Sequence, residues 1–273
     1  MSRWLITGCS TGIGRAIADA ALGAGNSVLV TARRPESVQD LVDAHPGHAV
    51  SAPLDVTDRD QIAEAVEAAR AAFGGVDVLV NNAGYGYLSA VEEGDDAEVR
   101  ALFDTNFFGA VDMIKAVLPE MRAQGSGHIV NVSSMTGIVT NPPNTYYSAT
   151  KHALEALTEG LSKEVGPLGI KVTAIEPGAF QTDYLTRSMR EAESIDSYGH
   201  VTERKELMKA FGEHLPGDPA KLAAAVLQVV DLDDPPLRLL LGQDVLHAFR
   251  EKTAAWTATV DEWEHVTTSV NFS

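Results

Sequence analysis

A tyrosine and a lysine four residues apart, Tyr147 and Lys151, form the most suggestive chemical pair in the sequence. On a helix the two side chains would share one face. A free phenol has a pKa of about 10 and is a poor base near neutrality, whereas a nearby ammonium group favours the phenolate and lowers that pKa. The pair could therefore exchange a proton with a substrate, although the same spacing also occurs in ordinary surface pairs. The adjacent Tyr146 is a weaker candidate because its partner four residues on, Thr150, carries no charge.

Two adjacent serines could place a hydroxyl beside such an acid/base group. Ser133 and Ser134 follow an apolar run that predicts a strand over His128–Ser133, and the carboxyl ends of parallel strands are where such sheets bind ligands. A hydroxyl there could polarise a carbonyl oxygen, and the alternative is a turn residue at a strand end. No His/Asp pairing suggests a hydrolase, and the eight histidines show no metal-ligand spacing. Neither a hydrolase nor a metal centre is indicated.

A glycine-rich turn follows the first predicted strand, in the segment TGCSTGIG from Thr7 to Gly14. Gly8 permits a sharp turn, Gly12 lets the backbone approach a pyrophosphate, and Gly14 lets the next helix pack closely on the strand. Exposed N–H groups at the start of that helix favour an anion. Glycines also serve ordinary tight turns, but their position after the first strand of an alternating chain favours dinucleotide binding.

Two arginines stand where the second strand ends, in the run Thr31-Ala32-Arg33-Arg34. A site selective for NAD places an acidic residue at this strand end, on the ribose 2′-hydroxyl. Here Ala32 occupies that position, and a guanidinium group suits a 2′-phosphate through paired hydrogen bonds. The sequence therefore predicts a preference for NADP(H). A solvated turn before a helix is the alternative, and the nearby Glu36 leaves NAD(H) open.

Strand-like runs that alternate with helical runs must position these side chains, and this alternation predicts a single Rossmann-type, doubly wound α/β domain. The expected strands are Trp4–Thr7, Ser27–Thr31, Ala49–Leu54, Val76–Asn81, His128–Ser133, Ile170–Ile175 and an edge strand, Leu237–Leu241. The expected helices are Gly12–Ala24, one after Pro35, Asp58–Phe73, one long helix Ala97–Ala123, Tyr147–Val165, Pro219–Val230 and a terminal segment to about Thr257. The polar stretch 180–216 breaks the alternation, and no pattern is evident beyond Thr257.

The composition is that of a folded protein with an acidic surface. The 273 residues are 45% hydrophobic and 22% charged, with a net charge of −17, which argues against disorder and against a nucleic-acid partner. The lone Cys9 permits no internal disulfide, and its place in the glycine-rich turn suits a passive small residue. No signal peptide or membrane span is evident, so a cytoplasmic location is expected.

Five motifs in order identify a family resemblance. They are TGxxxGIG at Thr7–Gly14, Asn81-Asn82-Ala83-Gly84, Ser134, Tyr147-Ser-Ala-Thr-Lys151 and Pro177-Gly178. In this order and spacing the chain resembles the short-chain dehydrogenase/reductase family over about residues 3–245. The resemblance implies the sheet order 3-2-1-4-5-6-7 and a catalytic domain spanning residues 1–273, with a substrate lid at about 180–216 and a C-terminal extension from about 243.

The resemblance also implies a role for each site residue. Tyr147 would be the acid/base, Lys151 would lower its pKa and bind the nicotinamide ribose, and Ser134 would orient the substrate carbonyl. Asn106 would hold a water in the proton relay, and Asn81 would brace the sheet. The implied cofactor-binding residues fall into groups. Asp55 and Val56 would meet the adenine, Asn82, Ala83 and Gly84 would line a ribose, and Pro177, Gly178 and Thr182 would lie at the nicotinamide end. The others are Gly8, Ser10, Thr11, Gly12, Ile13, Gly14, Arg33, Arg34, Tyr147 and Lys151.

The expected activity is hydride transfer between NADP(H) and a carbonyl/alcohol pair. An NAD-dependent alcohol dehydrogenase on the same scaffold and an NADP(H)-binding sensor without turnover are the alternatives. Lid residues that suggest an apolar substrate, unless they pack the lid's own helices, are Tyr184, Met189, Tyr198, Met208 and Phe211. Tyr85 and Tyr87 are further candidates for the pocket wall. The family's usual interface, formed by the helices near 97–123 and 147–165, implies a homodimer or homotetramer.

Overall fold

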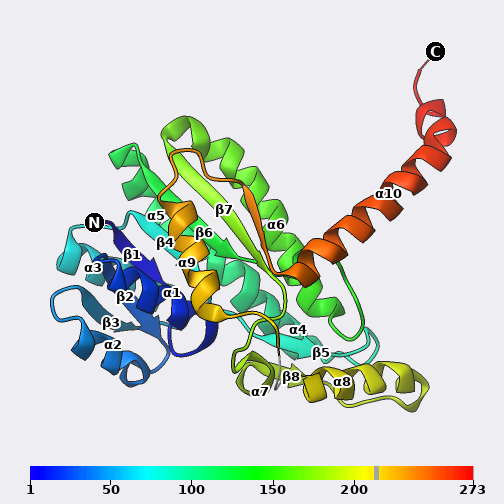
Figure 1. The fold of residues 1–273 in the computed structure, drawn as a ribbon, viewed down its shortest axis with the longest axis horizontal. Coiled ribbons are helices and arrows are strands. Elements are labelled where there is room, and N and C mark those ends of the chain that lie inside the picture. The colour runs from blue at the N-terminus through cyan, green and yellow to red at the C-terminus, as the bar shows by residue number, and fades with distance from the viewer. Residues whose placement is uncertain (212–214, 273) are drawn as a thin grey trace.

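Runs of valine, isoleucine and leucine form a parallel sheet at the centre of the fold (Figure 1). The sheet consists of β1 (Arg3–Ile6), β2 (Ser27–Ala32), β3 (Ala49–Pro53), β4 (Val78–Asn81), β6 (Gly127–Val132), β7 (Ile170–Pro177) and β9 (Arg238–Leu241). Its spatial order is β3-β2-β1-β4-β6-β7-β9, and every pairing is parallel. Counted within this sheet, the order is 3-2-1-4-5-6-7, which confirms the predicted Rossmann-type α/β fold.

The computed structural model describes residues 1–211 and 215–272. The α-helices are α1 (Gly12–Gly23), α2 (Gln39–Ala44), α3 (Arg59–Phe73), α4 (Asp96–Phe103), α5 (Gly109–Gln124), α6 (Thr145–Val165), α7 (Tyr184–Arg187), α8 (Gly199–Phe211), α9 (Pro219–Val230) and α10 (Gln243–Ser269). Short 3-10 turns are η1 (Pro35–Val38), η3 (Met135–Gly137), η4 (Gly166–Leu168) and η5 (Asp196–Tyr198), and η2 (Asp104–Phe108) is a π-helix.

Helices cover both faces of the sheet, because successive strand residues point to opposite sides. Ile6 and its strand neighbours pack against α1 and α9 in one buried cluster. Leu5 aligns with Leu29 and Leu79, and these three pack against α3, α5 and α6 in a second cluster. Two apolar layers therefore hold the sheet rigid and leave the carboxyl ends of its strands free to carry the site.

The predicted long helix over 97–123 is wrong in one respect, because a π-helix interrupts it between α4 and α5. Asn106 lies in this π-helix, and its side chain is buried. Its amide donates to the carbonyl oxygen of Tyr85 (2.9 Å) and accepts from the Tyr85 N–H (3.0 Å). The tertiary contact thus coincides with the local widening of the helix, a feature that often marks functional sites.

Two short strands that the alternation did not reveal form a separate parallel pair. β5 (Gly86–Leu88) follows the NNAG segment, and β8 (Met189–Glu191) lies in the lid region. Three residues are too few for a periodic signal. The pair fastens the lid to the segment beside the sheet, and a buried ion pair between Lys205 and Glu93 (2.9 Å) fastens α8 to the same side of the fold.

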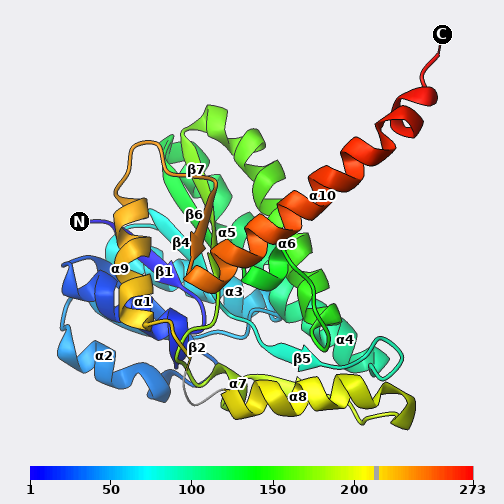
Figure 2. The ribbon, with the colours of Figure 1, turned by 45° about the vertical axis from the view of Figure 1, so that its right-hand side comes forward.

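The terminal helix is longer than expected. α10 continues to Ser269, whereas the sequence pattern predicted an end near Thr257. In Figures 1 and 2 its first turns lie against the domain and the rest projects away from it. The distal half carries no buried residue, and its spaced apolar positions were not recognised in the sequence as a helical pattern. Over the described residues, no helix has both the length and the apolar character that a membrane crossing requires.

Candidate active site

A cleft of about 1240 Å³ opens at the carboxyl edge of the sheet. Its walls come from the segments that follow β1, β2, β3, β4, β6 and β7, together with the lid. Sites for drug-sized molecules usually span roughly 300–1,000 Å³. The cleft therefore has room for an extended ligand such as a dinucleotide together with a small substrate.

The glycine-rich turn forms one end of the cleft. Gly8 and Gly12 adopt φ values of 72° and 63°, a left-handed conformation that glycine accepts without strain. Gly12 lines the cleft. Gly14 does not line it. It packs so closely on its neighbours that a side chain at this position would overlap the Asn82 amide and the Gly8 carbonyl oxygen. The predicted packing role of Gly14 is thus seen, with the Asn82 side chain as its neighbour.

The turn offers N–H groups without a competing carboxylate. α1 begins directly after Thr11, and its first turn contains no acidic residue. Asn82 donates from its side-chain amide to the carbonyl oxygens of Thr7 (2.9 Å) and Gly8 (3.1 Å), which braces the turn from below. This cradle suits a phosphate anion. Cys9 is buried behind the turn, and burial raises the pKa of its thiol to about 12, so it stays a neutral packing residue.

The end of β2 carries the arginine pair. Ala32 and Arg33 line the cleft, whereas Arg34 does not. Within residues 1–211 and 215–272 the Arg33 guanidinium makes no ion pair, while Arg15 is held by Asp40. Arg33 is therefore available to an anionic ligand, and the geometry gives no such role to Arg34.

Most of the other cofactor-binding candidates meet in this cleft. Those that line it are Ser10, Thr11, Ile13, Asp55, Val56, Asn82, Ala83, Gly84, Pro177, Gly178 and Thr182. Asp55 is held from two sides, since its N–H donates to the Gln61 side chain and its carboxylate accepts from the Thr57 N–H. Asn81 lies behind them and donates to the Asn131 side chain (2.9 Å) between β4 and β6, as the predicted sheet brace would.

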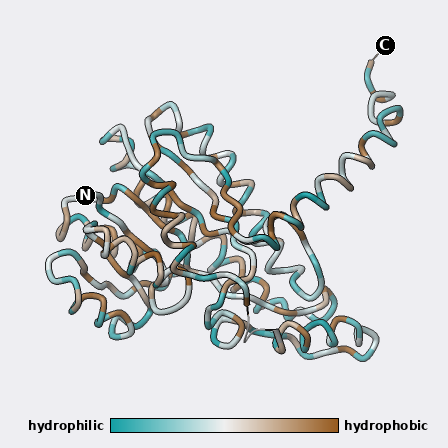
Figure 3. The backbone as a smooth tube through the Cα atoms, in the orientation of Figure 1, coloured by the Kyte–Doolittle hydropathy of each residue, from teal (hydrophilic) through white to brown (hydrophobic). Residues whose placement is uncertain are grey.

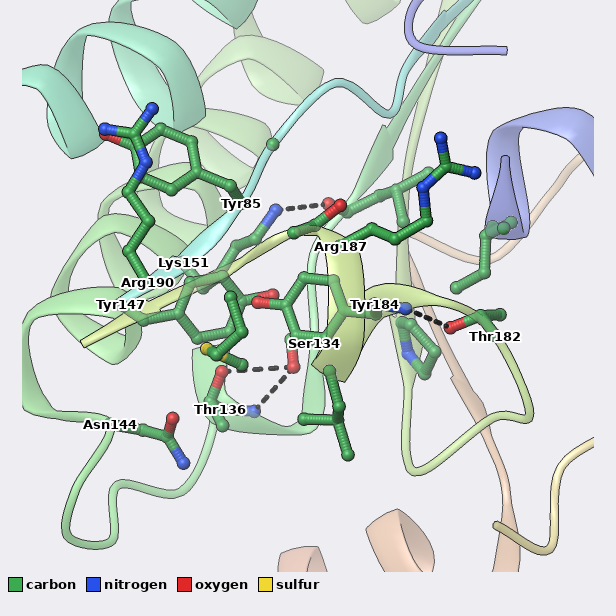
Figure 4. A pocket seen from close by; sticks show the side chains of 18 of the residues that line it. Tyr85, Ser134, Thr136, Asn144, Tyr147, Lys151, Thr182, Tyr184, Arg187 and Arg190 are labelled. Atoms are coloured by element: carbon green, nitrogen blue, oxygen red, sulfur yellow. Dashed lines mark hydrogen bonds between the residues drawn. The ribbon is translucent and has the colours of Figure 1, made fainter. Parts of the chain in front are cut away.

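Tyr147, Ser134 and Lys151 meet at the centre of the cleft (Figure 4). Lys151 lies one helical turn after Tyr147 on α6, with its Nζ 5.7 Å from the centre of the Tyr147 ring. Ser134 follows β6 at the strand end, and its Oγ accepts hydrogen bonds from the N–H (3.1 Å) and the hydroxyl (3.0 Å) of Thr136. Both accepted bonds orient Ser134 and leave its own proton for a ligand. The neighbouring Ser133 hydroxyl is buried against Gly137.

The charges at this centre differ from the sequence expectation in one respect. Burial raises the pKa of Tyr147 above its ordinary value, and the groups that act in the opposite direction are the hydroxyls of Tyr184 and Ser134. Lys151 is buried as well, which lowers the pKa of its ammonium to about 8, and it donates to the Val132 carbonyl oxygen (2.8 Å). A lowering of the Tyr147 pKa by Lys151 is therefore not seen in the protein alone.

Tyr184 is a site residue whose position the sequence did not predict. It begins α7 in the lid, and its ring lies 6.0 Å from that of Tyr147 between centroids, inclined by 48°. Figure 4 shows the two hydroxyls directed toward one another. Its backbone N–H donates to the Thr182 hydroxyl (3.3 Å), so the same turn that holds the cofactor candidate Thr182 also positions the second phenol.

Asn106 is buried next to α6 and does not line the cleft. Besides its two hydrogen bonds to Tyr85, its amide donates to the Thr150 hydroxyl (3.2 Å) on α6. The side chain is therefore fully engaged and sits 3.0 Å from where a Gly84 side chain would begin. It joins the NNAG segment to the helix that carries Tyr147 and Lys151.

The segment around Pro177 and Gly178 is held by a residue that sequence analysis missed. Asp244, in the first turn of α10, accepts a hydrogen bond from the Ala179 N–H (2.7 Å). The carboxylate also lies where side chains at Gly178 or Gly242 would have to go. The base of α10 thus braces the nicotinamide end of the predicted cofactor site. Ala179 and Asp244 are 65 residues apart in the sequence, and no sequence motif predicted their contact.

The lid forms the remaining wall with a mixture of apolar and charged side chains. Of the predicted residues, Tyr184, Met189 and Met208 line the cleft, while Tyr198 is bonded to Glu92 outside it and the side chain of Phe211 lies outside the described residues. Tyr85 lines the cleft, but Tyr87 is buried away from it. Polar lid residues in the lining are Arg187, Arg190, His200, Glu203 and Arg204.

Comparison with known proteins places the chain in a family. The model of the short chain dehydrogenase family matches residues 3–193. An oxidoreductase, BOA17, of Botryotinia fuckeliana is 38% identical over 96% of this chain and 97% of its own. A 3-ketodihydrosphingosine reductase of Bacteroides thetaiotaomicron is 36% identical over 92% of this chain and 91% of its own. The protein belongs to the short-chain dehydrogenase family and is an oxidoreductase.

Solved structures agree with this assignment. A short-chain dehydrogenase from Streptomyces avermitilis superposes with a TM-score of 0.93 at 43% identity and covers 99% of this chain and 100% of its own, so the match includes α10. The closed form of a serine dehydrogenase, solved with NADP+, has a TM-score of 0.76 at 28% identity and covers 87% of this chain and 93% of its own.

Proposed function

We propose that this protein is an NADP(H)-preferring oxidoreductase that reduces a carbonyl to an alcohol, or performs the reverse reaction. The observation that carries the proposal is the convergence of Tyr147, Ser134 and Lys151 in the same cleft as the glycine-rich turn. A dinucleotide seated on the turn would extend along the strand ends toward these three side chains, as ligands do in sheets of this kind. We further propose that residues 1–273 work as one catalytic domain, with 180–216 as its lid.

The residues present fit a nicotinamide dinucleotide. The helix start with no acidic side chain would hold its pyrophosphate, and Asp55 and Val56 would flank its adenine. Thr182 lies close to the turn, because a Cβ atom at Gly12 would be 3.7 Å from the Thr182 Cβ. Pro177 and Gly178 would lie at the nicotinamide end, where the bound dinucleotide would supply or accept the hydride.

In the direction of reduction, Tyr147 gives its phenol proton to the carbonyl oxygen while the carbonyl carbon gains the hydride, so that C=O becomes CH–OH. Ser134 donates a hydrogen bond from its hydroxyl to the same oxygen and stabilises the developing negative charge. Lys151, which is charged below about pH 8, stabilises the phenolate left on Tyr147. Asn106 fixes the helix that carries both residues, and a water in its neighbourhood would return the proton.

Arg33 supports the preference for NADP(H). It stands free of ion pairs in the described structure and lines the cleft at the end of β2, with Ala32 where an NAD-selective site has an acid. A guanidinium there suits a 2′-phosphate. The serine dehydrogenase solved with NADP+ supports the same proposal by similarity.

The substrate proposed is a carbonyl compound with a sizeable apolar part. Met189 and Met208 line the lid side of the cleft, together with Leu185 and Leu207. Similarity to a 3-ketodihydrosphingosine reductase points to the same class of substrate. Arg187 and Arg190 of the lid are paired with Asp183 and Glu98, whereas Arg204 makes no ion pair within the described residues and favours a substrate that also carries a polar or anionic group at that end.

The activity is tested by NADPH consumption over a chemically diverse panel of carbonyl compounds that spans chain length and charge. We expect turnover with NADPH on at least one apolar ketone or aldehyde, and tight cofactor binding without turnover on any compound would contradict the proposal. Arg33→Ala should lower kcat/KM for NADPH by about 10-fold or more, as for the loss of a charge-assisted hydrogen bond of about 1.5–3 kcal/mol, while NADH use changes little. Arg34→Ala is the matched control. Equal losses with both cofactors in Arg33→Ala would disprove the preference.

A further inference from the structure

The distal half of α10 is a helix without a partner in its own chain. Every residue from Thr253 to Val270 is exposed, and Figures 1 and 2 show the segment projecting from the domain in two orientations. Seventeen residues of helix extend about 25 Å at 1.5 Å per residue. A solitary helix of this length is marginal in water, because most helix stability in proteins comes from packing an apolar face.

The sequence places an apolar stripe along this helix, and Figure 3 shows hydrophobic and hydrophilic positions interspersed along its backbone. Its members recur at intervals of three or four residues, the spacing at which helices pack in pairs. They are Leu246, Phe249, Thr253, Trp256, Val260, Trp263 and Val266. Two large aromatic side chains dominate it, with Trp256 66% and Trp263 54% exposed. Isolated exposed hydrophobic residues are common, but a continuous stripe with two tryptophans marks an interaction surface.

The stripe continues past the point where α10 leaves the domain. At the base of the helix, Val245 is buried, and Lys252 donates to the Ile138 carbonyl oxygen in the loop after η3, so this face belongs to the domain. Leu246 and Phe249 lie on the outer side and stay 37% and 39% exposed. The base therefore offers open apolar side chains on the same line as the two tryptophans of the tip.

Charge on α10 favours an antiparallel partner of the same sequence. The tip carries Asp261, Glu262 and Glu264 with no lysine or arginine, whereas at the base Arg250 and Lys252 offset Asp244 and Glu251. In an antiparallel pair centred near Trp256, Arg250 of one copy faces Glu262 of the other, and Trp263 of one covers Phe249 of the other. The acidic tip disfavours an anionic lipid surface, which attracts helices rich in lysine and arginine.

We infer that the projecting part of α10 is an assembly arm that pairs antiparallel with the α10 of a second copy of this chain. Aromatic side chains bury roughly 150–250 Å² each. Because Trp256 and Trp263 are 66% and 54% exposed, the four tryptophans of such a pair would remove at most roughly 600 Å² from water. That is about half of the roughly 1,200 Å² at the lower end of the range for stable interfaces, and Phe249, Val260 and Val266 would add to it. The inference does not depend on the proposed activity.

The molar mass in solution, measured by light scattering, tests the arm. Trp256→Glu with Trp263→Glu should halve the mass of the full-length protein, because the arm is the contact that joins the two copies. Ala254→Glu with Ala258→Glu adds the same charge on the opposite face of the helix, and this control should keep the wild-type mass. Equal masses for the wild type and the tryptophan variant would overturn the inference. A wild-type protein that is monomeric in solution would also overturn the inference, whether or not its arm binds anionic phospholipid vesicles.

The antiparallel register has its own test. With the buried Cys9 replaced by alanine, Arg250→Cys and Glu262→Cys chains of different tag length are oxidised separately and as a mixture. Disulfide-linked dimers should form between unlike chains in the mixture and not within either sample alone. Efficient self-linking of each variant would indicate a parallel pair and contradict the proposed arrangement.

Discussion

Tyr184 directs its hydroxyl at the hydroxyl of Tyr147, with the two rings 6.0 Å apart and inclined by 48° (Figure 4). Tyr147, the proposed acid/base, belongs to α6, and Tyr184 belongs to α7 in the proposed lid. Burial raises the pKa of Tyr147, and the Tyr184 hydroxyl is the first of the groups that act against this rise. The lid therefore influences the proton affinity of the catalytic group as well as the shape of the pocket.

Replacing Tyr184 by phenylalanine should remove this influence while keeping the ring. Loss of one hydrogen bond is worth about 0.5–1.5 kcal/mol, so we expect the apparent pKa that limits alcohol oxidation to rise by up to about one unit. Oxidation near neutral pH should slow about 2- to 10-fold, because less phenolate forms. The pH profile of kcat gives the measurement. Tyr146→Phe, which removes a hydroxyl bonded to the Val91 carbonyl oxygen outside the site, should leave the profile unchanged, and an unchanged profile in Tyr184→Phe would mean that Tyr184 only fills space.

Asp244 should matter for cofactor binding although it lies in the C-terminal helix. In Asp244→Ala the Ala179 N–H loses its acceptor, which should cost about 1–3 kcal/mol in the free energy of unfolding. The loosened segment around Gly178 should also weaken NADPH binding several-fold. Asp244→Asn keeps an acceptor oxygen and should recover most of the loss. Fluorescence titration with NADPH and thermal unfolding measure both effects, with the exposed Gln243→Ala as control. Wild-type affinity in Asp244→Ala would show that the contact does not position the site.

Glu176 predicts how stability depends on pH. Burial and the neighbouring Glu155 raise its pKa from 4.5 to about 8, although Arg238 lies 3.8 Å away. Between these values the folded protein holds a proton that the unfolded chain has released, so stability should fall as pH rises from about 4.5 to about 8 and level off above. Glu176→Gln mimics the protonated group and should flatten this decline.

Thermal unfolding at a series of pH values measures the effect, at about 2–4 °C in Tm for each kcal/mol in a protein of this size. Glu159→Gln is the matched control, since its ion pairs with Lys163 and Arg238 lower its pKa to about 2, below the window. The same slope in wild type and Glu176→Gln would show that Glu176 does not carry the effect.

The fold and the centre of the site could be predicted because their signals are local. Buried parallel strands appear as continuous apolar runs, and Tyr147 and Lys151 share a helix face by spacing alone. The glycines of the turn could be placed because strand ends meet at one edge of the sheet, whereas the choice of Ser134 over Ser133 came from the family resemblance. Those groups meet in one cleft in the structure.

What could not be predicted depends on contacts between distant segments. The π-helix at Asn106 coincides with hydrogen bonds to Tyr85, and the brace at Ala179 comes from Asp244. Tyr184 lies in a lid whose polar sequence has no period that would show which residues face inward. The distal part of α10 carries apolar residues at helical spacing, but none of them is buried in this chain and threonines and acidic residues surround them, so the sequence pattern was not recognised as a helix.

The central claim is that Tyr147 exchanges the proton with the substrate oxygen. Its most direct test is the rate of NADPH oxidation in a single turnover, with enzyme in excess over the best carbonyl of the panel, in wild type and Tyr147→Phe. The Tyr147→Phe protein should bind NADPH within about 3-fold of wild type, because the ring and Lys151 remain. Its hydride-transfer rate should fall by about 10²- to 10⁴-fold, the usual contribution of general acid catalysis. A Tyr147→Phe rate close to wild type would contradict the assignment of Tyr147.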